Sequence, residues 1–164
     1  MSTCGAGGIG DVLGVLTPEA GTQSPDGPGF ASMAGETVVV RQTGECEGGS
    51  DGVDAGPGRV LVWGAGSGAG YVGWLIVGDD PDKWPVIVWE RHGWLYWKIY
   101  GGGVTELLRC LFTMGFDECP LSGASLWGEA TPHFLHWREG QRRWDSGIDP
   151  CTGEPDPCFG MEFD

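Results

Sequence analysis

The side chains that could act in catalysis are spread along this chain without a recognisable catalytic spacing. The sequence contains no Gly-x-Ser-x-Gly segment, and no cysteine has the context of an active-site nucleophile. The paired carboxylates Asp79 and Asp80 fall in a segment rich in turn-forming residues, where aspartate commonly caps a turn. The three histidines lie near aromatic residues or proline, as packed or surface histidines do. We therefore expect a protein that is not an enzyme.

Cysteine and histidine could together hold a metal ion, but their spacing is unfavourable. The six cysteines include no Cys-x-x-Cys pair, and Cys151 and Cys158 are separated by a proline-rich segment. His133 and His136 fall in a strand-like segment, where residues three apart point to opposite faces. Joint coordination of zinc would need them on one side. We expect no metal site.

The glycine-rich segment 64–70 has the spacing of a dinucleotide-binding loop, since Gly64, Gly66 and Ala69 fit Gly-x-Gly-x-x-Ala after an apolar run. That mechanism needs a helix to begin there, so that backbone N–H groups meet a pyrophosphate. The residues that follow, 71–77, are β-branched and aromatic instead. The segment is therefore predicted to join two strands of a hairpin, and no cofactor is expected.

The chain carries a formal net charge of −14, and the excess acid is at its two ends. Residues 1–58 hold eight acids and one arginine, for −7; residues 117–164 hold ten acids and three arginines, again −7; the segment between them is neutral. Nucleic acid and anionic lipid require Lys or Arg to replace counterions, so neither is an expected partner. Such a chain should attract a basic protein, although the acid could also serve solubility alone.

The predicted elements give an α+β fold, with a mostly antiparallel, twisted sheet of short strands packed by one main C-terminal helix. Val104, Leu107, Leu108, Leu111 and Phe112 recur at helical spacing, with Gly115 as the expected left-handed residue that ends the helix. Strands are predicted at 59–63, 71–77, 85–89 and 94–100, with a turn over 78–82.

The remaining segments are less regular. Residues 9–16 form one short apolar run, and 30–42 fit either a strand or a helix, while 48–58 are expected to be a loop. After Cys119-Pro120 come short apolar segments, then an acidic, proline-rich tail that we expect to be mobile.

Nine tryptophans in 164 residues allow two interpretations. Trp89, Trp94 and Trp97 could stack on sugars or nucleobases if one face exposed them. They could instead form a core with an aromatic rim, which is the more usual role of such residues.

The central stretch resembles the SUKH superfamily, the Smi/Knr-type domains common among bacterial immunity proteins. The resemblance is carried by Leu61-x-Trp63-Gly64, by Trp74, and by Gly78-x-Asp80-Pro81-Asp82-x-Trp84-Pro85-Val86-Ile87-Val88, followed by the strand at 94–100 and the helix that begins near Thr105. The residues that the motif would use structurally are Trp63, Gly64, Trp74, Asp80, Pro81, Trp84 and Pro85.

This resemblance covers about residues 4–115 and departs from the family pattern in two places. Helices usually precede the glycine-rich start at residues 4–9, and the turn between the first two strands usually carries Gly-Asp where this chain has Ser67-Gly68-Ala69-Gly70. The expected organisation is a SUKH-like domain at 1–120, apparently shortened at its N-terminus, and a C-terminal extension at 121–164.

The resemblance implies a domain that binds proteins, without a catalytic residue. Bacterial members look like antidotes that block toxin domains, often nucleases, whose basic grooves suit an acidic partner. The expected function is therefore an immunity protein for a basic toxin domain; the alternatives are a regulatory scaffold with several partners, or a carbohydrate- or nucleotide-binding module that uses exposed tryptophan.

The expected partner contacts are acids in loops beside the sheet, since binding residues concentrate on loops held by a rigid scaffold. They are Asp79, Asp80, Asp82, Glu90, Asp117 and Glu118. The chain starts without a basic and apolar export signal and has no apolar run near the ~20 residues of a membrane helix. We expect a cytoplasmic protein with free thiols.

Overall fold

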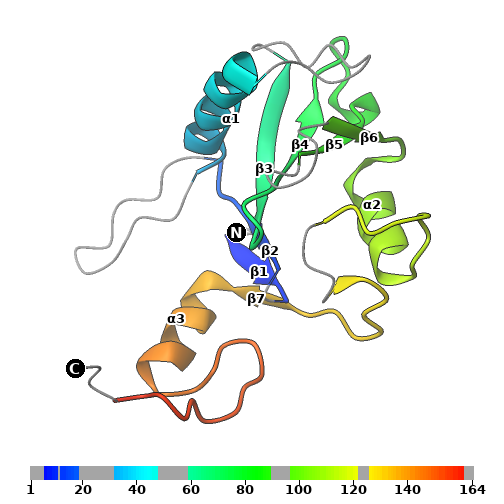
Figure 1. The fold of residues 1–164 in the computed structure, drawn as a ribbon. Coiled ribbons are helices and arrows are strands. Elements are labelled where there is room, and N and C mark those ends of the chain that lie inside the picture. The colour runs from blue at the N-terminus through cyan, green and yellow to red at the C-terminus, as the bar shows by residue number, and fades with distance from the viewer. Residues whose placement is uncertain are drawn as a thin grey trace.

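The computed structural model describes residues 6–10, 12–18, 32–47, 59–89, 97–121 and 126–160 (Figure 1). These residues form seven strands, three α-helices and one short 3-10 helix. In chain order they are β1 (Gly7–Ile9), β2 (Leu13–Val15), α1 (Met33–Glu47), β3 (Val60–Gly66), β4 (Tyr71–Leu75), η1 (Pro81–Lys83), β5 (Val86–Trp89), β6 (Trp97–Tyr100), α2 (Gly103–Phe112), β7 (Phe134–His136) and α3 (Trp137–Asp145). The predicted α+β class is confirmed.

The strands form one antiparallel sheet in the order β6-β5-β4-β3-β2-β1-β7. The meander predicted from the central sequence is confirmed, because β3 to β6 follow one another across the sheet. The glycine-rich segment 64–70 joins β3 to β4 as a hairpin: the N–H of Gly66 donates to the Gly70 carbonyl at 2.8 Å. No helix follows this segment, so the geometry for a pyrophosphate is absent here.

The apolar run at 9–16 is a hairpin, not the single element that its composition predicts. β1 and β2 pair antiparallel, with Ile9 opposite Leu13. The turn uses Gly10, whose φ of 58° is in the left-handed region that glycine adopts without strain. A single glycine therefore divides the run into two strands, and the second of these pairs with β3.

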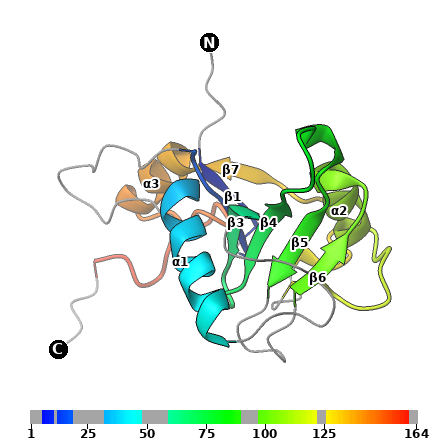
Figure 2. The same ribbon diagram turned by 90° about the horizontal axis from the view of Figure 1, so that it is seen from above.

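Each face of the central sheet is covered by one helix, as Figure 2 shows. On one face, Leu107 and Leu111 of the predicted leucine stripe of α2 are buried against Val72, Val86 and Val88. On the other face, Val40 of α1 packs with the side chains of Val60, Val62, Leu75 and Ile87. The prediction of one main helix thus misses α1, which encloses a second, smaller core.

The segment at 30–42, which fits a strand or a helix by sequence, forms α1. Its β-branched run Thr37-Val38-Val39-Val40 places only its first and last residues against the sheet, where both are buried. Val38 and Val39 are 50% and 46% exposed. Residues three apart share a face of a helix, so burying Thr37 and Val40 together favours helix over the intrinsic strand preference.

A bulge interrupts β3 at Trp63, where the register with β4 shifts between Val62 and Gly64. Trp63 is buried in the core under α2 and lies 5.8 Å from the Trp74 ring. Gly64 pairs with Val72, which belongs to the same core, so Trp63 and Gly64 both face α2. A side chain at Gly64 would come within 3.1 Å of Leu13.

The end of α2 differs in detail from its prediction. Met114, not Gly115, is the left-handed residue, with φ of 52°. The N–H of Gly115 donates to the Cys110 carbonyl at 2.7 Å, which satisfies one of the last helical carbonyls. The helix therefore ends at the predicted place, but its left-handed residue is Met114, one position before the predicted Gly115.

The described part of the C-terminal segment, residues 126–160, is structured, contrary to the expected mobile tail. β7 pairs with β1 and joins directly to α3, so residues beyond 120 contribute a strand to the main sheet. After α3, the N–H of Asp149 donates to the Glu154 carbonyl and that of Asp156 donates to the Gly147 carbonyl, both at 2.8 Å. Backbone bonding, rather than apolar burial, gives this segment its shape, which is why composition fails to predict it.

Across the described part of the chain, no helix combines the length and the apolar character needed to cross a membrane.

Candidate partner-binding surface

The loop between β4 and β5 carries three of the predicted contact residues and is built by the most specific part of the sequence motif. Gly78 has φ of 67°. Asp80 caps η1 by accepting the N–H of Asp82 at 3.3 Å, and Pro81 takes the first helical position, where no donor is needed. The Trp84 indole N–H donates to the Gly78 carbonyl at 3.2 Å and closes the loop.

One of the three carboxylates of this loop holds the loop together, and the other two are exposed. Asp80 is occupied by the cap and by an ion pair with Lys83 at 2.9 Å. Asp79 and Asp82 are exposed, and neither has a basic partner among the residues that the structure describes. Of the three predicted contacts here, Asp79 and Asp82 are therefore the ones available to another molecule, on a loop whose backbone is already fixed.

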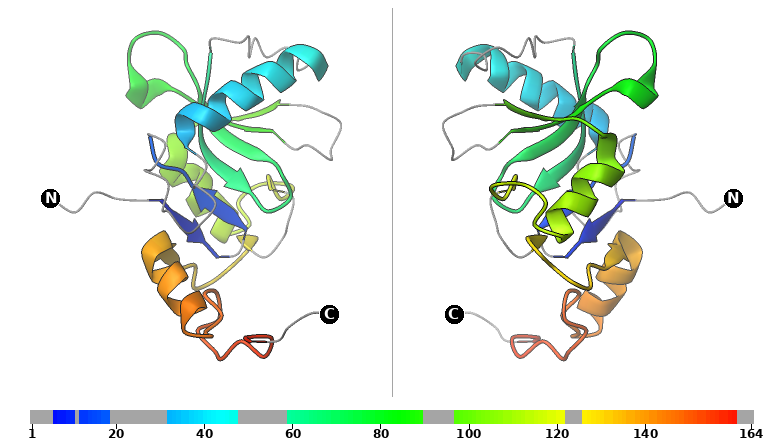
Figure 3. Two further views of the ribbon diagram at one scale, coloured as in Figure 1. Left: turned by 90° about the vertical axis from the view of Figure 1, so that its left-hand side faces the viewer. Right: turned by 90° about the vertical axis from the view of Figure 1, so that its right-hand side faces the viewer.

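Asp117 and Glu118 lie after the end of α2 and are exposed. Glu118 forms an ion pair with Lys98 of β6, and the hydrogen bond from that lysine holds the pKa of Glu118 below its usual range. Figure 3 shows the 78–83 loop beyond the start of α2 and the 113–121 segment beyond its end. The structure thus places the two acidic groups at opposite ends of α2, not in one cluster. Glu90 lies outside the described residues.

The terminal strand β6 lies between these two groups. Its outer backbone edge has no strand neighbour among the described residues, and this was not predicted from the sequence. The N–H of Leu75 donates to the Pro85 carbonyl at 2.9 Å, which fixes the phase of the β4–β5 ladder. Backbone groups in an antiparallel strand turn alternately to either side. The N–H and C=O of Val88 therefore turn to β6, where Val88 pairs with Lys98. Ile99 follows Lys98 in β6, so the N–H and C=O of Ile99 point to the outer edge of the sheet, away from β5.

The first half of β3, which does not pair with β2, would present a similar edge, but α1 covers it. β2 pairs with β3 only from Gly64 onward. Beyond that point the buried Thr37 hydroxyl accepts the N–H of Val62 at 2.9 Å. Arg41 donates to the Val60 carbonyl from Nε at 3.2 Å and from Nη2 at 2.8 Å. Side chains of a helix thus replace the missing strand.

The tryptophans of the sheet contact one another and are largely enclosed. Tyr71, Trp89 and Trp97 are register partners on adjacent strands, with ring centroids 5.7 Å and 6.1 Å apart. Trp89 and Trp63 are buried, and Trp97 is partly buried. This arrangement favours the core interpretation for the described rings; Trp94 lies outside the described residues.

The buried thiol of Cys110 could have been a nucleophile, but its surroundings disfavour the thiolate. Burial, and a hydrogen bond to Glu106, raise the pKa of the Cys110 thiol. The Arg109 guanidinium bonds both Glu106 oxygens, at 2.6 Å and 2.8 Å, and lowers the pKa of that carboxyl to about 2. The carboxylate is therefore ionised and paired, and it has no capacity to act as a base near neutral pH.

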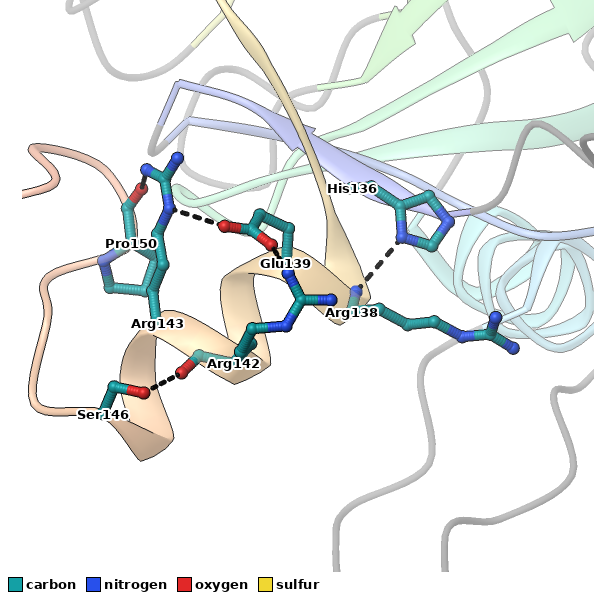
Figure 4. Close-up of polar contacts among 7 residues, drawn as sticks. All are labelled: His136, Arg138, Glu139, Arg142, Arg143, Ser146 and Pro150. Carbon is teal, nitrogen blue, oxygen red and sulfur yellow. Dashed lines mark hydrogen bonds and ion pairs between the residues drawn. The ribbon is translucent and has the colours of Figure 1, made fainter.

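Two of the three arginines of α3 bond within their own segment, as Figure 4 shows. Arg143 contacts Glu139 at 3.3 Å and donates to the Pro150 carbonyl at 3.2 Å, while Arg142 pairs with Glu139.

His136 Nδ1 accepts the Arg138 N–H at 3.2 Å as the cap of α3. One of the two histidines considered for zinc therefore uses a ring nitrogen to start a helix. Among the described residues, no group of three His, Cys, Asp or Glu side chains could hold a metal ion.

Comparison of the chain with protein families, curated proteins and solved structures gives no match.

Proposed function

We propose that this chain is a non-catalytic immunity protein that neutralises a basic toxin domain, such as a nuclease, by binding to it. The observation that carries the proposal is the pair Asp79 and Asp82, two exposed carboxylates without basic partners among the described residues, on a loop fixed by its own hydrogen bonds. Because the loop is already ordered, little conformational entropy is lost on binding. The resemblance of the surrounding motif to the SUKH superfamily supports the same function.

Electrostatics supports a basic partner over nucleic acid or an anionic membrane. Ion pairs join Lys83, Lys98, Arg109, Arg142 and Arg143 to neighbouring carboxylates, so these cations are partly neutralised. The chain keeps a net charge of −14, with the excess acid in residues 1–58 and 117–164. This charge would speed encounter with a basic groove and repel a phosphate backbone.

The test is co-expression in bacteria with a basic toxin domain encoded beside the gene of this chain. We expect restored growth, a complex on gel filtration, and affinity that falls at least tenfold between 50 mM and 500 mM salt, as expected for charge-steered association (order of magnitude). The double variant Asp79→Lys/Asp82→Lys should weaken the complex by about 1–3 kcal/mol, since it places like charges at the contact.

A matched control changes the same number of charges elsewhere. Asp145 and Glu154 are exposed in the C-terminal segment, at the opposite end of the molecule from the 78–83 loop (Figure 3). Asp145→Lys/Glu154→Lys should preserve most of the affinity. Equal loss in both double variants would mean that only overall charge matters, and rescue of growth without a complex would contradict direct neutralisation.

A further inference from the structure

We propose that β6 is the docking strand for this partner: an extended, basic segment of the toxin domain adds to the free edge of β6 as an eighth strand. This inference rests on the proposed function and names the partner's binding mode. The described edge of β6 has no strand neighbour other than β5. Strand addition supplies affinity through main-chain hydrogen bonds and specificity through alternate side chains.

The backbone of β6 is ready for such an addition. The N–H and C=O of Ile99 point away from β5, as the ladder phase requires, and those of Trp97 do the same two residues earlier. The described residues provide no hydrogen-bond partner for these outward groups. Lys98 and Tyr100 bond β5 in alternation with them, so a new strand can bind without breaking the existing ladder.

The side chains of β6 give the edge two different faces. Ile99 is 45% exposed, and with Trp97 it lies on the face that α1 partly covers. Lys98 lies on the opposite face, where it forms an ion pair with Glu118 of the acidic 117–118 segment. A complementary strand would place apolar side chains beside Ile99 and basic side chains beside Glu118.

The acidic 78–83 loop extends this complementarity along the strand. Tyr100 pairs with Val86, the residue at which β5 begins after the loop. Lys98 lies opposite Val88, about 7 Å from that end at 3.3–3.4 Å per residue. The 78–83 loop thus leads into the β5 residue opposite the Tyr100 end of β6, and Glu118 contacts Lys98 nearer the other end. A segment with alternating basic residues matches these carboxylates better than a neutral one.

The other strand edges do not match a basic partner as well. α1 covers β3 through Thr37 and Arg41. β7 has three residues and leads directly into α3, whose first turn carries Arg138 and Glu139, and Glu139 is paired with Arg142 and Arg143. Charge thus distinguishes β6 from β7, although both are terminal strands.

The first experiment uses nuclear magnetic resonance of the intact chain, with the peptide acetyl-Arg-Val-Arg-Ile-Arg-Val-amide as the probe. We expect amide exchange at Ile99 and Trp97 to slow at least tenfold near saturation, roughly the effect of one stable added hydrogen bond. Exchange at Lys98 and Tyr100, which already bond β5, should change much less. The peptide with glutamate in place of arginine should have no effect.

Three results would overturn the inference. They are unchanged exchange at Ile99 at millimolar peptide, equal protection by the glutamate peptide, or slowing at Ile99 that rises with the concentration of the chain alone. The third result would assign the edge to a second copy of this chain.

The second experiment separates backbone from side chain in the toxin complex. Ile99→Pro removes the outward N–H, and we expect affinity to fall tenfold or more; Ile99→Thr keeps that N–H and a branched side chain, and should lose threefold or less. Circular dichroism checks that both variants fold, and the exchange measurement on the unmodified chain stands if the proline variant does not. If Asp79→Lys/Asp82→Lys weakens the complex but Ile99→Pro does not, strand addition fails while the immunity function survives.

Discussion

The N-terminal half of β3 and the outer side of β6 are two edges of one sheet. Side chains of α1 cover the first, and no described residue covers the second. At β3, the N–H of Val62 and the carbonyl of Val60 bond side chains of α1 and are buried. At β6, the backbone groups of Ile99 point outward beside an exposed side chain. Unpaired edges invite association with other chains, and proteins usually cover or charge them. This protein covers the β3 edge with α1, whereas the described part of the β6 edge carries the Lys98–Glu118 ion pair. In the proposed docking, the acids near β6 would repel an acidic neighbour and admit a basic one.

The largest expected contrast between the two edges is in amide exchange of the free protein. The Val62 amide should exchange at least a thousandfold more slowly than the Ile99 amide, relative to their intrinsic rates, because only large openings expose Val62 (order of magnitude). Residue-resolved exchange measures both at once. Similar protection at the two positions would remove the distinction between a covered and an open edge.

The cover on β3 can be broken by a substitution that hardly changes shape. Thr37→Val should lower the free energy of unfolding by about 1–3 kcal/mol, since it leaves the buried Val62 N–H without its acceptor. Thr37→Ser retains the hydroxyl and is the matched control, to be compared by urea denaturation. A valine variant as stable as the wild type would show that the hydroxyl is not what seals this edge.

The corresponding change at the open edge should be almost silent in the free protein. Ile99→Lys is expected to alter the free energy of unfolding by no more than about 0.5 kcal/mol, because the side chain is 45% exposed and its outward backbone groups have no partner among the described residues. The same variant should abolish binding of the basic peptide. Strong destabilisation in denaturation experiments would mean that Ile99 serves the core instead.

The smallest expected effect concerns the charges beside β6. The pKa of Glu118 is lowered in the folded protein by Lys98, so the pair stabilises the fold above the unfolded pKa of about 4.3 and ceases to do so as pH falls through the folded value. Glu118→Gln should therefore show a slightly lower Tm than the wild type at neutral pH, and the difference should vanish in acid once the pH has fallen below the folded pKa of Glu118. A Tm difference that is constant across this range would exclude the ion pair as its cause.

The meander and α2 follow from sequence because their signals are local. Strand-forming runs, glycine turns and a leucine stripe each specify their own segment, and the hairpin at 64–70 needs nothing further. The turn-forming residues of the 78–83 loop likewise predict that its acids lie at the surface. α1 is different, because Thr37 and Val40 select a helix only when β3 is present to receive them.

The candidate site is only partly accessible to sequence reasoning for the same reason. Asp79, Asp80 and Asp82 have similar surroundings in the sequence, and only the hydrogen bonds show that Asp80 is used within the loop. The outward direction of Ile99 depends on the phase of a ladder set by Leu75 and Pro85, which composition does not encode. The C-terminal segment is held by backbone bonds between residues that would suit a disordered tail equally well.

The bulge at Trp63 has a consequence for how β3 tolerates changes in length. Before it, even-numbered residues such as Val62 face α1; after it, Gly64 faces α2. One surplus residue thus acts as a phase shift between two halves of a single strand. Deleting Trp63 would leave Val62 and Gly64 adjacent in a regular ladder but would remove a buried ring from the core under α2, whereas deleting any other residue of β3 would shift one half of the strand by one position against β4.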